Sequence, residues 1–351
     1  MAKKEERPNM LQKLKEDIRQ DTPGRLYFFY GEEIFLLNHY LKQLQKNLVD
    51  PVTESFNFHK LTNETFDLQS FADCVENLPM MAERTMTIVD EIDIFKMNEA
   101  DRERMAEILS DIPDYCTVVF TYETVLFKPD KRFKKLWDAV EKNGLLVEFE
   151  KQSQRDLINW ISRHFAANSK KISPDLCLYL IELTGGTMTA LSGEIAKICA
   201  YSDAPAVVKS DIDAVVEPVL DAVVFHMTDL LAKGEYGAAL QKLRQLLKMQ
   251  EEELGILGAI GGHIRRLGAA RTLLDNGKTY SDLQRLYGYN VMGEYQAKKT
   301  MAAARNFSPK FCATAAQLVM ETDRQIKTSY DEPGRLLEML LLRFSQEARY
   351  G

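Results

Sequence analysis

The chain has 351 residues, of which 45% are hydrophobic and 28% are charged. A chain of this length buries two or three separate cores rather than one, and we expect three domains. The formal net charge of −7 argues against a protein that binds nucleic acid over a broad basic face, because phosphate binding requires clustered lysine and arginine. A local contact with DNA stays open.

Neither the start of the chain nor its cysteines suggest a secreted or membrane protein. Residues 1–10 are polar and charged, without the apolar segment of a signal peptide, and no later apolar run approaches the ~18 residues that span a bilayer. We therefore expect a cytoplasmic protein without membrane contact. The five cysteines lie far apart, which predicts reduced thiols and no metal site, disulfide or cofactor. They are Cys74, Cys116, Cys177, Cys199 and Cys312.

The first 150 residues alternate strand-like and helix-like segments, the pattern of a mostly parallel sheet with crossover helices. Residues 26–30 form a compact aromatic and aliphatic run, followed at once by Gly31 and by an apolar-periodic helix from Ile34. Four more strands are predicted at 56–61, 85–89, 116–122 and 145–149. We predict an α/β domain at 1–150.

After residue 150 nearly all of the chain has helical periodicity, so the fold class is α/β plus all-α. Residues 154–167, 174–184 and 188–201 predict a small helical domain at 151–218, in which Ser210 with Asp211 would cap a further short helix. An all-helical third domain is expected at 219–351. Its long amphipathic helices are predicted at 222–233, 236–250, 254–274, 310–327 and 333–349.

The turn after the first strand stands where a phosphate-binding loop would stand. Such a loop is spelled G-x-x-x-x-G-K-[ST], so that backbone amides and one lysine bind the phosphates. Gly31, Glu32 and Glu33 occupy this place, with no lysine and no second glycine. Because two carboxylates would repel a triphosphate, we predict a degenerate, non-functional nucleotide loop. The expected role of both glutamates is to favour the positive end of the following helix.

Three further motifs are similar to nucleotide sites, and we interpret each as structural. Val89-Asp90-Glu91 follows a strand, like the acidic pair that binds magnesium in P-loop ATPases, but it has no phosphate-binding loop to work with. Gly277-Lys278-Thr279 follows a helical segment and is typical of a helix-ending glycine and a loop. Gly255, Gly258, Gly261 and Gly262 lie inside a helical pattern, which predicts close helix packing rather than a dinucleotide site.

Two adjacent methionines follow a predicted helix end. That helix carries one buried stripe at helical spacing, made of Phe71, Cys74, Val75 and Leu78. Pro79 disfavours helical geometry at Leu78, so Met80 and Met81 leave the helical register, with Leu78 as the core member of the motif. The residues alone leave two alternatives. The flexible methionines project into a shallow apolar pocket of a partner, or they fold back under the sheet as core.

Several segments carry a family pattern in a fixed order. In the first domain they are Tyr-Phe-Phe-Tyr-Gly-Glu-Glu (27–33), Asn-Leu-Pro-Met-Met-Ala-Glu-Arg (77–84) and Lys-Pro-Asp-Lys-Arg (128–132). Further along they are Thr-Gly-Gly-Thr (184–187), Glu-Ile-Ala-Lys (194–197), Leu-Leu-Ala-Lys-Gly (230–234) and Asp-Arg-Gln-Ile-Lys-Thr (323–328). Over most of its length the chain resembles the delta subunits of the bacterial clamp loader of DNA polymerase III.

The resemblance implies a AAA+-like fold, with a RecA-type parallel-sheet domain, a small helical lid and a helical collar. It implies a component of the DNA polymerase III holoenzyme, a nucleotidyltransferase, that binds and opens the beta sliding clamp for loading onto primed DNA without hydrolysing ATP. The implied partners are the clamp, the gamma/tau ATPase subunits and delta prime, in a heteropentamer. Leu78, Pro79, Met80 and Met81 would form the clamp-binding element.

A basic stretch after the fourth strand has two interpretations, which are contact with DNA inside the loader or an ordinary solvated face. It consists of Lys128, Lys131, Arg132, Lys134 and Lys135. Two rival functions remain beside the delta-subunit hypothesis. One is an active AAA+ ATPase, which the missing lysine of the phosphate loop opposes, and the other is a helical adaptor unrelated to replication.

Overall fold

A computed structural model describes residues 10–248, 251–288 and 293–350. The chain divides into two compact units between Lys151 and Gln152, next to the predicted end of the sheet domain. The polar segment 1–9 and the predicted helix end at Gln250 lie outside the described residues. The predicted division near residue 218 stays a prediction, because the helices on both sides of it belong to the second unit.

The first unit is built on a five-stranded sheet whose strands run parallel in the order β2-β3-β4-β1-β5. The strands are β1 (Leu26–Gly31), β2 (Phe58–Leu61), β3 (Thr85–Asp90), β4 (Cys116–Tyr122) and β5 (Gly144–Phe149). All five predicted strands are present. The second begins later than predicted, because Phe56 and Asn57 belong to a single helical turn, α3 (Glu54–Asn57).

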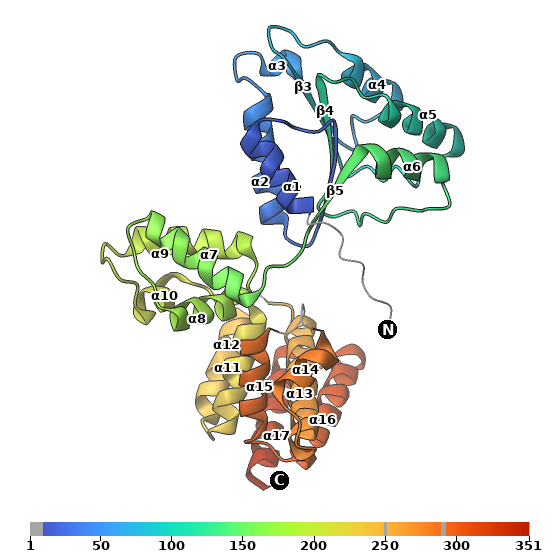
Figure 1. The fold of residues 1–351 in the computed structure, drawn as a ribbon. Helices are drawn as coiled ribbons and strands as arrows, with labels where there is room; N and C mark the ends of the chain where they lie inside the picture. Colours follow the sequence, from blue (N-terminus) through green and yellow to red (C-terminus); the bar gives the residue numbers. More distant parts are fainter. Residues whose placement is uncertain (1–9, 249–250, 289–292, 351) are drawn as a thin grey trace. The chain divides into compact units, whose positions relative to one another are not determined.

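Helices cover both faces of this sheet (Figure 1), as burial of a parallel sheet requires. One face lies under α1 (Met10–Gln20) and α2 (Ile34–Leu48), and the other under α4 (Leu68–Glu76), α5 (Glu99–Ser110) and α6 (Lys134–Asn143). Side chains of β1 alternate between the two cores, since successive residues of a strand point to opposite faces. Tyr27 and Phe29 pack on the α1/α2 side, and Leu26 and Phe28 on the other.

The named elements of the second unit are all helices among its described residues (Figure 1), and one isolated β-bridge joins Lys171 to Ala206. Its first four helices are α7 (Gln154–Ala167), α8 (Pro174–Thr184), α9 (Met188–Tyr201) and α10 (Lys209–Val215). The rest are α11 (Leu220–Ala232), α12 (Tyr236–Lys248), α13 (Glu253–Asp275), α14 (Tyr280–Tyr287), α15 (Glu294–Ala304), α16 (Pro309–Thr328) and α17 (Pro333–Tyr350). Residues of α11 to α17 share one apolar core. The short helices α14 and α15 were not predicted.

Two expectations in the helical unit need correction. Helix α10 begins at Lys209, and its first turn is capped by Asp211, whose carboxylate accepts a hydrogen bond from the backbone N–H of Val208. Ser210 is therefore inside the helix and is not its cap. The prediction of close helix packing is confirmed for Gly261, where a Cβ would lie 3.0 Å from Val319 of α16. It is wrong for the other three glycines, which no other helix approaches as closely.

The other motif of that unit agrees with its structural interpretation. Gly277 follows α13 with a φ of +66°, the left-handed conformation that ends many helices. Thr279 is then the N-cap residue of α14, and the carboxylate of Asp282 accepts a hydrogen bond from the Thr279 N–H. No phosphate-binding geometry is involved.

Candidate protein-binding surface

The segment after α4 leaves the helix earlier than the sequence pattern suggested. Helix α4 ends at Glu76, where the Tyr115 hydroxyl donates to the Glu76 carbonyl oxygen over 3.1 Å, and Asn77 is already extended. Residues 77–84 then form an irregular loop that leads into β3. The prediction that Met80 and Met81 lie outside the helical register is confirmed.

Three apolar side chains of this loop are exposed. Leu78 is 70% exposed, Met80 53% and Met81 92%. The prediction that Leu78 is a core residue is wrong, because it lies two residues past the end of α4 and the i+7 position no longer exists there. The alternative in which both methionines fold back under the sheet as core is excluded by the exposure of their side chains. Phe71 and Val75, inside the helix, are buried as predicted.

A buried asparagine from α3 fixes the backbone of this loop. Asn57 is 1% exposed, and its side-chain oxygen accepts a hydrogen bond from the Met80 N–H over 2.8 Å. Its Nδ2 donates to the Met80 carbonyl oxygen over 2.9 Å. Met81 follows with a φ of +54°, in the left-handed region.

Sequence analysis missed this asparagine and the aromatic residue before it. Phe56 is 53% exposed and Val52 86%, and the Phe56 carbonyl accepts a hydrogen bond from Asn77 Nδ2 over 3.3 Å. The sequence pattern predicts a strand at 56–61 and so places Phe56 in it. An asparagine between two phenylalanines, just before a strand, was the available signal for a turn.

The degenerate nucleotide loop is tied to the end of β5. Gly31 has a φ of +132°, and a Cβ at this position would overlap the Phe149 carbonyl. The Glu33 N–H donates to the same carbonyl oxygen over 2.9 Å. Glu32 forms an ion pair with Lys151 at 3.0 Å. Glu33 is the N-cap residue of α2 and is buried, so both glutamates lie at the positive end of that helix, as expected.

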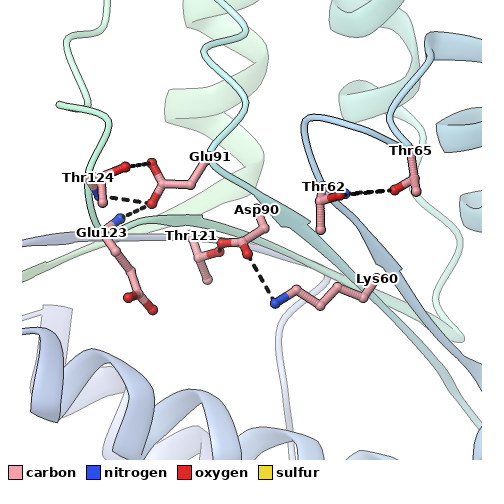
Figure 2. A network of polar contacts seen from close by, with 8 residues as sticks. All are labelled: Lys60, Thr62, Thr65, Asp90, Glu91, Thr121, Glu123 and Thr124. Atoms are coloured by element: carbon pink, nitrogen blue, oxygen red, sulfur yellow. Dashed lines mark hydrogen bonds and ion pairs between the residues drawn. The ribbon is translucent and has the colours of Figure 1, made fainter.

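The acidic pair at the end of β3, Asp90 and Glu91, is engaged by other residues of the protein (Figure 2). Asp90 accepts a hydrogen bond from the Thr121 hydroxyl over 2.7 Å and pairs with Lys60 at 3.0 Å. Glu91 accepts hydrogen bonds from the backbone N–H groups of residues 123, 124 and 125 and from the Thr124 hydroxyl. Burial raises the pKa of Glu91, but these four donors outweigh it and leave the pKa below its usual value.

The five basic residues after β4 are all exposed, and three of them already have partners. Arg132 makes a two-point ion pair with Asp130, with a shortest distance of 2.6 Å. Lys135 pairs with Glu107 at 3.2 Å, and Lys131 lies 5.2 Å from the centroid of the Trp137 ring. Lys128 and Lys134 have no ion-pair partner among the residues that the structure describes.

The described part of the chain gives no support for a metal site or for a membrane-spanning helix. No group of three or more histidine, cysteine, aspartate or glutamate residues is arranged there to bind a metal ion. Nor does any described helix combine the length and apolar character that crossing a membrane requires.

Comparison with known proteins agrees with this organisation. Family models described as "DNA polymerase III, delta subunit" and "DNA polymerase III delta subunit, C-terminal domain" match residues 27–150 and 221–344. The DNA polymerase III subunit delta of Bacillus subtilis (strain 168) is 25% identical over 323 residues, which cover 90% of this chain and 92% of that protein. The probable DNA polymerase III subunit delta of Aquifex aeolicus (strain VF5) is 21% identical over 263 residues, covering 72% and 73%.

A solved structure shows the same fold. The Bacillus subtilis DNA clamp loader delta protein matches with a TM-score of 0.60 at 21% identity, covering 96% of this chain and 99% of that one. The predicted fold class, α/β plus all-α with a parallel-sheet domain followed by helices, is confirmed. The two family models together match more than half of the chain, and we conclude that it belongs to the family of DNA polymerase III delta subunits.

Proposed function

We propose that this chain binds and opens the beta sliding clamp for loading onto primed DNA, and that it does so without hydrolysing ATP. The observation that carries the proposal is the loop 77–84, where Leu78, Met80 and Met81 are exposed together. Apolar side chains grouped on a surface indicate a protein-binding site. Burying one methionine contributes ~1.5–3 kcal/mol, so two form a substantial anchor in an apolar pocket of the clamp.

The nucleotide loop supports a non-hydrolysing role. Phosphates need free backbone amides and a lysine. Here the Glu33 N–H is bonded to the Phe149 carbonyl oxygen, and Glu32, which pairs with Lys151, adds a negative charge to the same segment. Glu91, in the position of an acidic catalytic residue, caps the loop after β4 instead. ATP hydrolysis would be supplied by gamma/tau subunits, with delta prime completing a heteropentamer.

The last two helices offer a surface for those subunits. Met320 of α16 is 73% exposed, and Met339 and Leu342 of α17 are each 47% exposed. An ion pair between Glu321 and Arg343, at 3.0 Å, joins the two helices next to Met320 and Leu342. We assign ring assembly to this part of the collar. Lys128 and Lys134 are the members of the basic stretch best placed to contact DNA phosphates, because the other three are engaged within the protein.

The deciding experiment measures the affinity of the full chain for the sliding clamp of the same organism. A Met80→Ala/Met81→Ala variant is expected to bind roughly 100-fold more weakly or worse, since ~1.4 kcal/mol corresponds to tenfold. Leu126→Ala is the matched control, because Leu126 is 66% exposed in the same unit but outside the loop. Unchanged binding by the double variant would move the site elsewhere, and no binding by the wild type would favour an adaptor unrelated to replication.

A second experiment addresses the ATPase alternative. Titration of the isolated chain with a fluorescent ATP analogue and magnesium is expected to give no saturable binding. Specific binding, or ATP hydrolysis that Glu91→Gln abolishes, would revive the active-ATPase hypothesis.

A further inference from the structure

The side chain of Asn57 makes three hydrogen bonds to two backbone segments. Its two N–H groups donate to the carbonyl oxygens of Thr53, over 3.2 Å, and Met80, over 2.9 Å. Its oxygen accepts the Met80 N–H over 2.8 Å. The amide therefore binds Met80 as a neighbouring strand would, through both backbone groups, from a site that is 1% exposed.

A second contact joins the same two segments. Asn77 Nδ2 donates to the Phe56 carbonyl oxygen over 3.3 Å and lies 3.2 Å from His59 Nε2. The turn that carries Phe56 is thus bonded to the loop at both residues 77 and 80. Phe56 is 53% exposed and Val52 86%, so the turn adds exposed apolar side chains to those of the loop to which it is bonded. Apolar side chains grouped on a surface indicate a protein-binding site.

We infer that the clamp-binding surface has two segments, residues 52–57 and 77–81, in which Phe56 contacts the clamp and Asn57 positions Met80. This inference rests on the proposed function. The partner is the same clamp because the two segments are bonded together, so a protein that covers Met80 and Met81 also reaches the neighbouring turn.

The physical reason for a positioning residue is the entropy of the loop. Fixing the backbone of a residue costs conformational entropy, and a loop that is ordered before binding does not lose this entropy on binding. Asn57 keeps Met80 and the left-handed Met81 in one conformation. Without it the loop would be ordered only by the clamp, and affinity would fall roughly tenfold for each residue that must be fixed.

The direct contact is tested with Phe56→Ala in the clamp-binding measurement on the full chain. We expect roughly tenfold weaker binding, because about half of the residue's surface is exposed and can be covered by a partner. The exposed side chain is outside the core, so the thermal midpoint should change little. Leu126→Ala serves as the control and is expected to bind like the wild type.

The positioning role is tested with Asn57→Asp. The new carboxylate still accepts the Met80 N–H but cannot donate to the carbonyl oxygens of Thr53 and Met80. We expect binding to weaken at least tenfold. Asn143→Asp is the matched control, since it also loses a donor to a backbone carbonyl, that of Leu109 at 3.2 Å, in the same unit.

Combining the Asn57 and methionine substitutions distinguishes positioning of Met80 from a general loss of stability. If Asn57 acts through Met80, then Asn57→Asp combined with Met80→Ala/Met81→Ala should bind no more weakly than the methionine variant alone. Additive losses would mean that Asn57 only stabilises the unit and would overturn its positioning role. Thermal unfolding of each variant, measured beside binding, shows that the compared proteins are folded.

The outcomes distinguish this inference from the function on which it rests. Binding that is lost in the methionine variant but retained in Phe56→Ala and Asn57→Asp would overturn the two-segment surface and leave the proposed function standing. A wild-type chain that does not bind the clamp at all would overturn both.

Discussion

Gly31 and Phe149 approach so closely that position 31 has no room for a side chain. A Cβ on residue 31 would overlap the Phe149 carbonyl, and the φ of +132° is one that L-residues rarely adopt. The glycine that begins a phosphate loop in a nucleotide-binding protein thus serves here to pair the ends of β1 and β5. Its presence needs no nucleotide to explain it.

Gly31→Ala is therefore expected to destabilise the sheet unit by about 2–4 kcal/mol, from backbone strain and overlap together. Urea unfolding followed by circular dichroism measures the change. Gly258→Ala is the contrasting control, since that glycine is inside α13 with open space around it, and alanine should stabilise the helix by about 0.5–1 kcal/mol. A neutral effect of Gly31→Ala would contradict the close approach to Phe149.

Glu91→Gln should destabilise the protein by about 1.5–3 kcal/mol at neutral pH, because four donors face the Glu91 carboxylate and one amide group cannot accept from all of them. The pKa of Glu91 lies below its usual value of 4.5. Its contribution is therefore complete above pH 4.5 and is lost as the pH falls through the lowered folded-state value.

Chemical unfolding between pH 7 and pH 3 tests this expectation. The stability difference between wild type and Glu91→Gln should shrink at the acidic end. Glu123→Gln is the control, since that glutamate is exposed and points away from the network (Figure 2). A pH-independent difference would mean that the Glu91 charge is not what the four donors stabilise.

We expect substitutions of two adjacent lysines of α15 to lower the stability of the helical unit by unequal amounts. Lys299 pairs with Glu182 of α8, whose side chain is 8% exposed, and His226 of α11 lies 3.5 Å from the same carboxylate. Lys299→Met leaves the buried Glu182 carboxylate with His226 as its remaining partner. The variant should lower the free energy of unfolding by about 1–3 kcal/mol. This is less than for a fully buried pair, because Lys299 is 27% exposed.

Lys298→Met is the matched control, because Lys298 is 54% exposed and pairs with Glu294, which is 53% exposed. Such exposed pairs contribute about 0–1 kcal/mol. Thermal unfolding of both variants, and of Lys299→Met with Glu182→Leu, measures the coupling. Equal effects of the two lysine variants would argue against a structural role for Glu182 between α8 and α15.

We expect acid to destabilise the helical unit, because His263 is buried there. It is 1% exposed and lies 2.7 Å from the Thr228 hydroxyl, which donates to the Phe225 carbonyl, so His263 is the donor to Thr228. Burial lowers the pKa of His263 from 6.5 to about 3. Below pH 6.5 the unfolded chain binds a proton that the folded protein does not.

Stability should therefore fall as the pH drops from 6.5 towards 3, by on the order of 1.4 kcal/mol for each pH unit. His263→Gln keeps a donor for Thr228 without a titrating group, and its stability should depend less on pH across this range. Unfolding curves at pH 7, 6, 5 and 4 make the comparison. Parallel pH profiles of the two proteins would assign the acid sensitivity to other groups.

Local pattern was sufficient for much of this protein. Short apolar runs indicate buried strands, and apolar stripes indicate helices. Both patterns can be recognised because side-chain direction repeats every two residues in a strand and every 3.6 residues in a helix. The five strands, the long helices, the absence of a lysine and a second glycine after Gly31, and the departure of Met80 and Met81 from the α4 register are all properties of neighbouring residues. They could be predicted from the sequence.

Tertiary structure decided what depends on residues far apart in the chain. Leu78 became exposed because α4 ends at Glu76, where Tyr115, 39 residues away, bonds to the helix end. Asn57 meets Met80 across 23 residues, and Glu91 meets its donors across 32 to 34. Periodicity says which face of an element is buried, but a hydrogen bond between distant segments depends on how the sheet and its loops pack, and no local pattern encodes that distance.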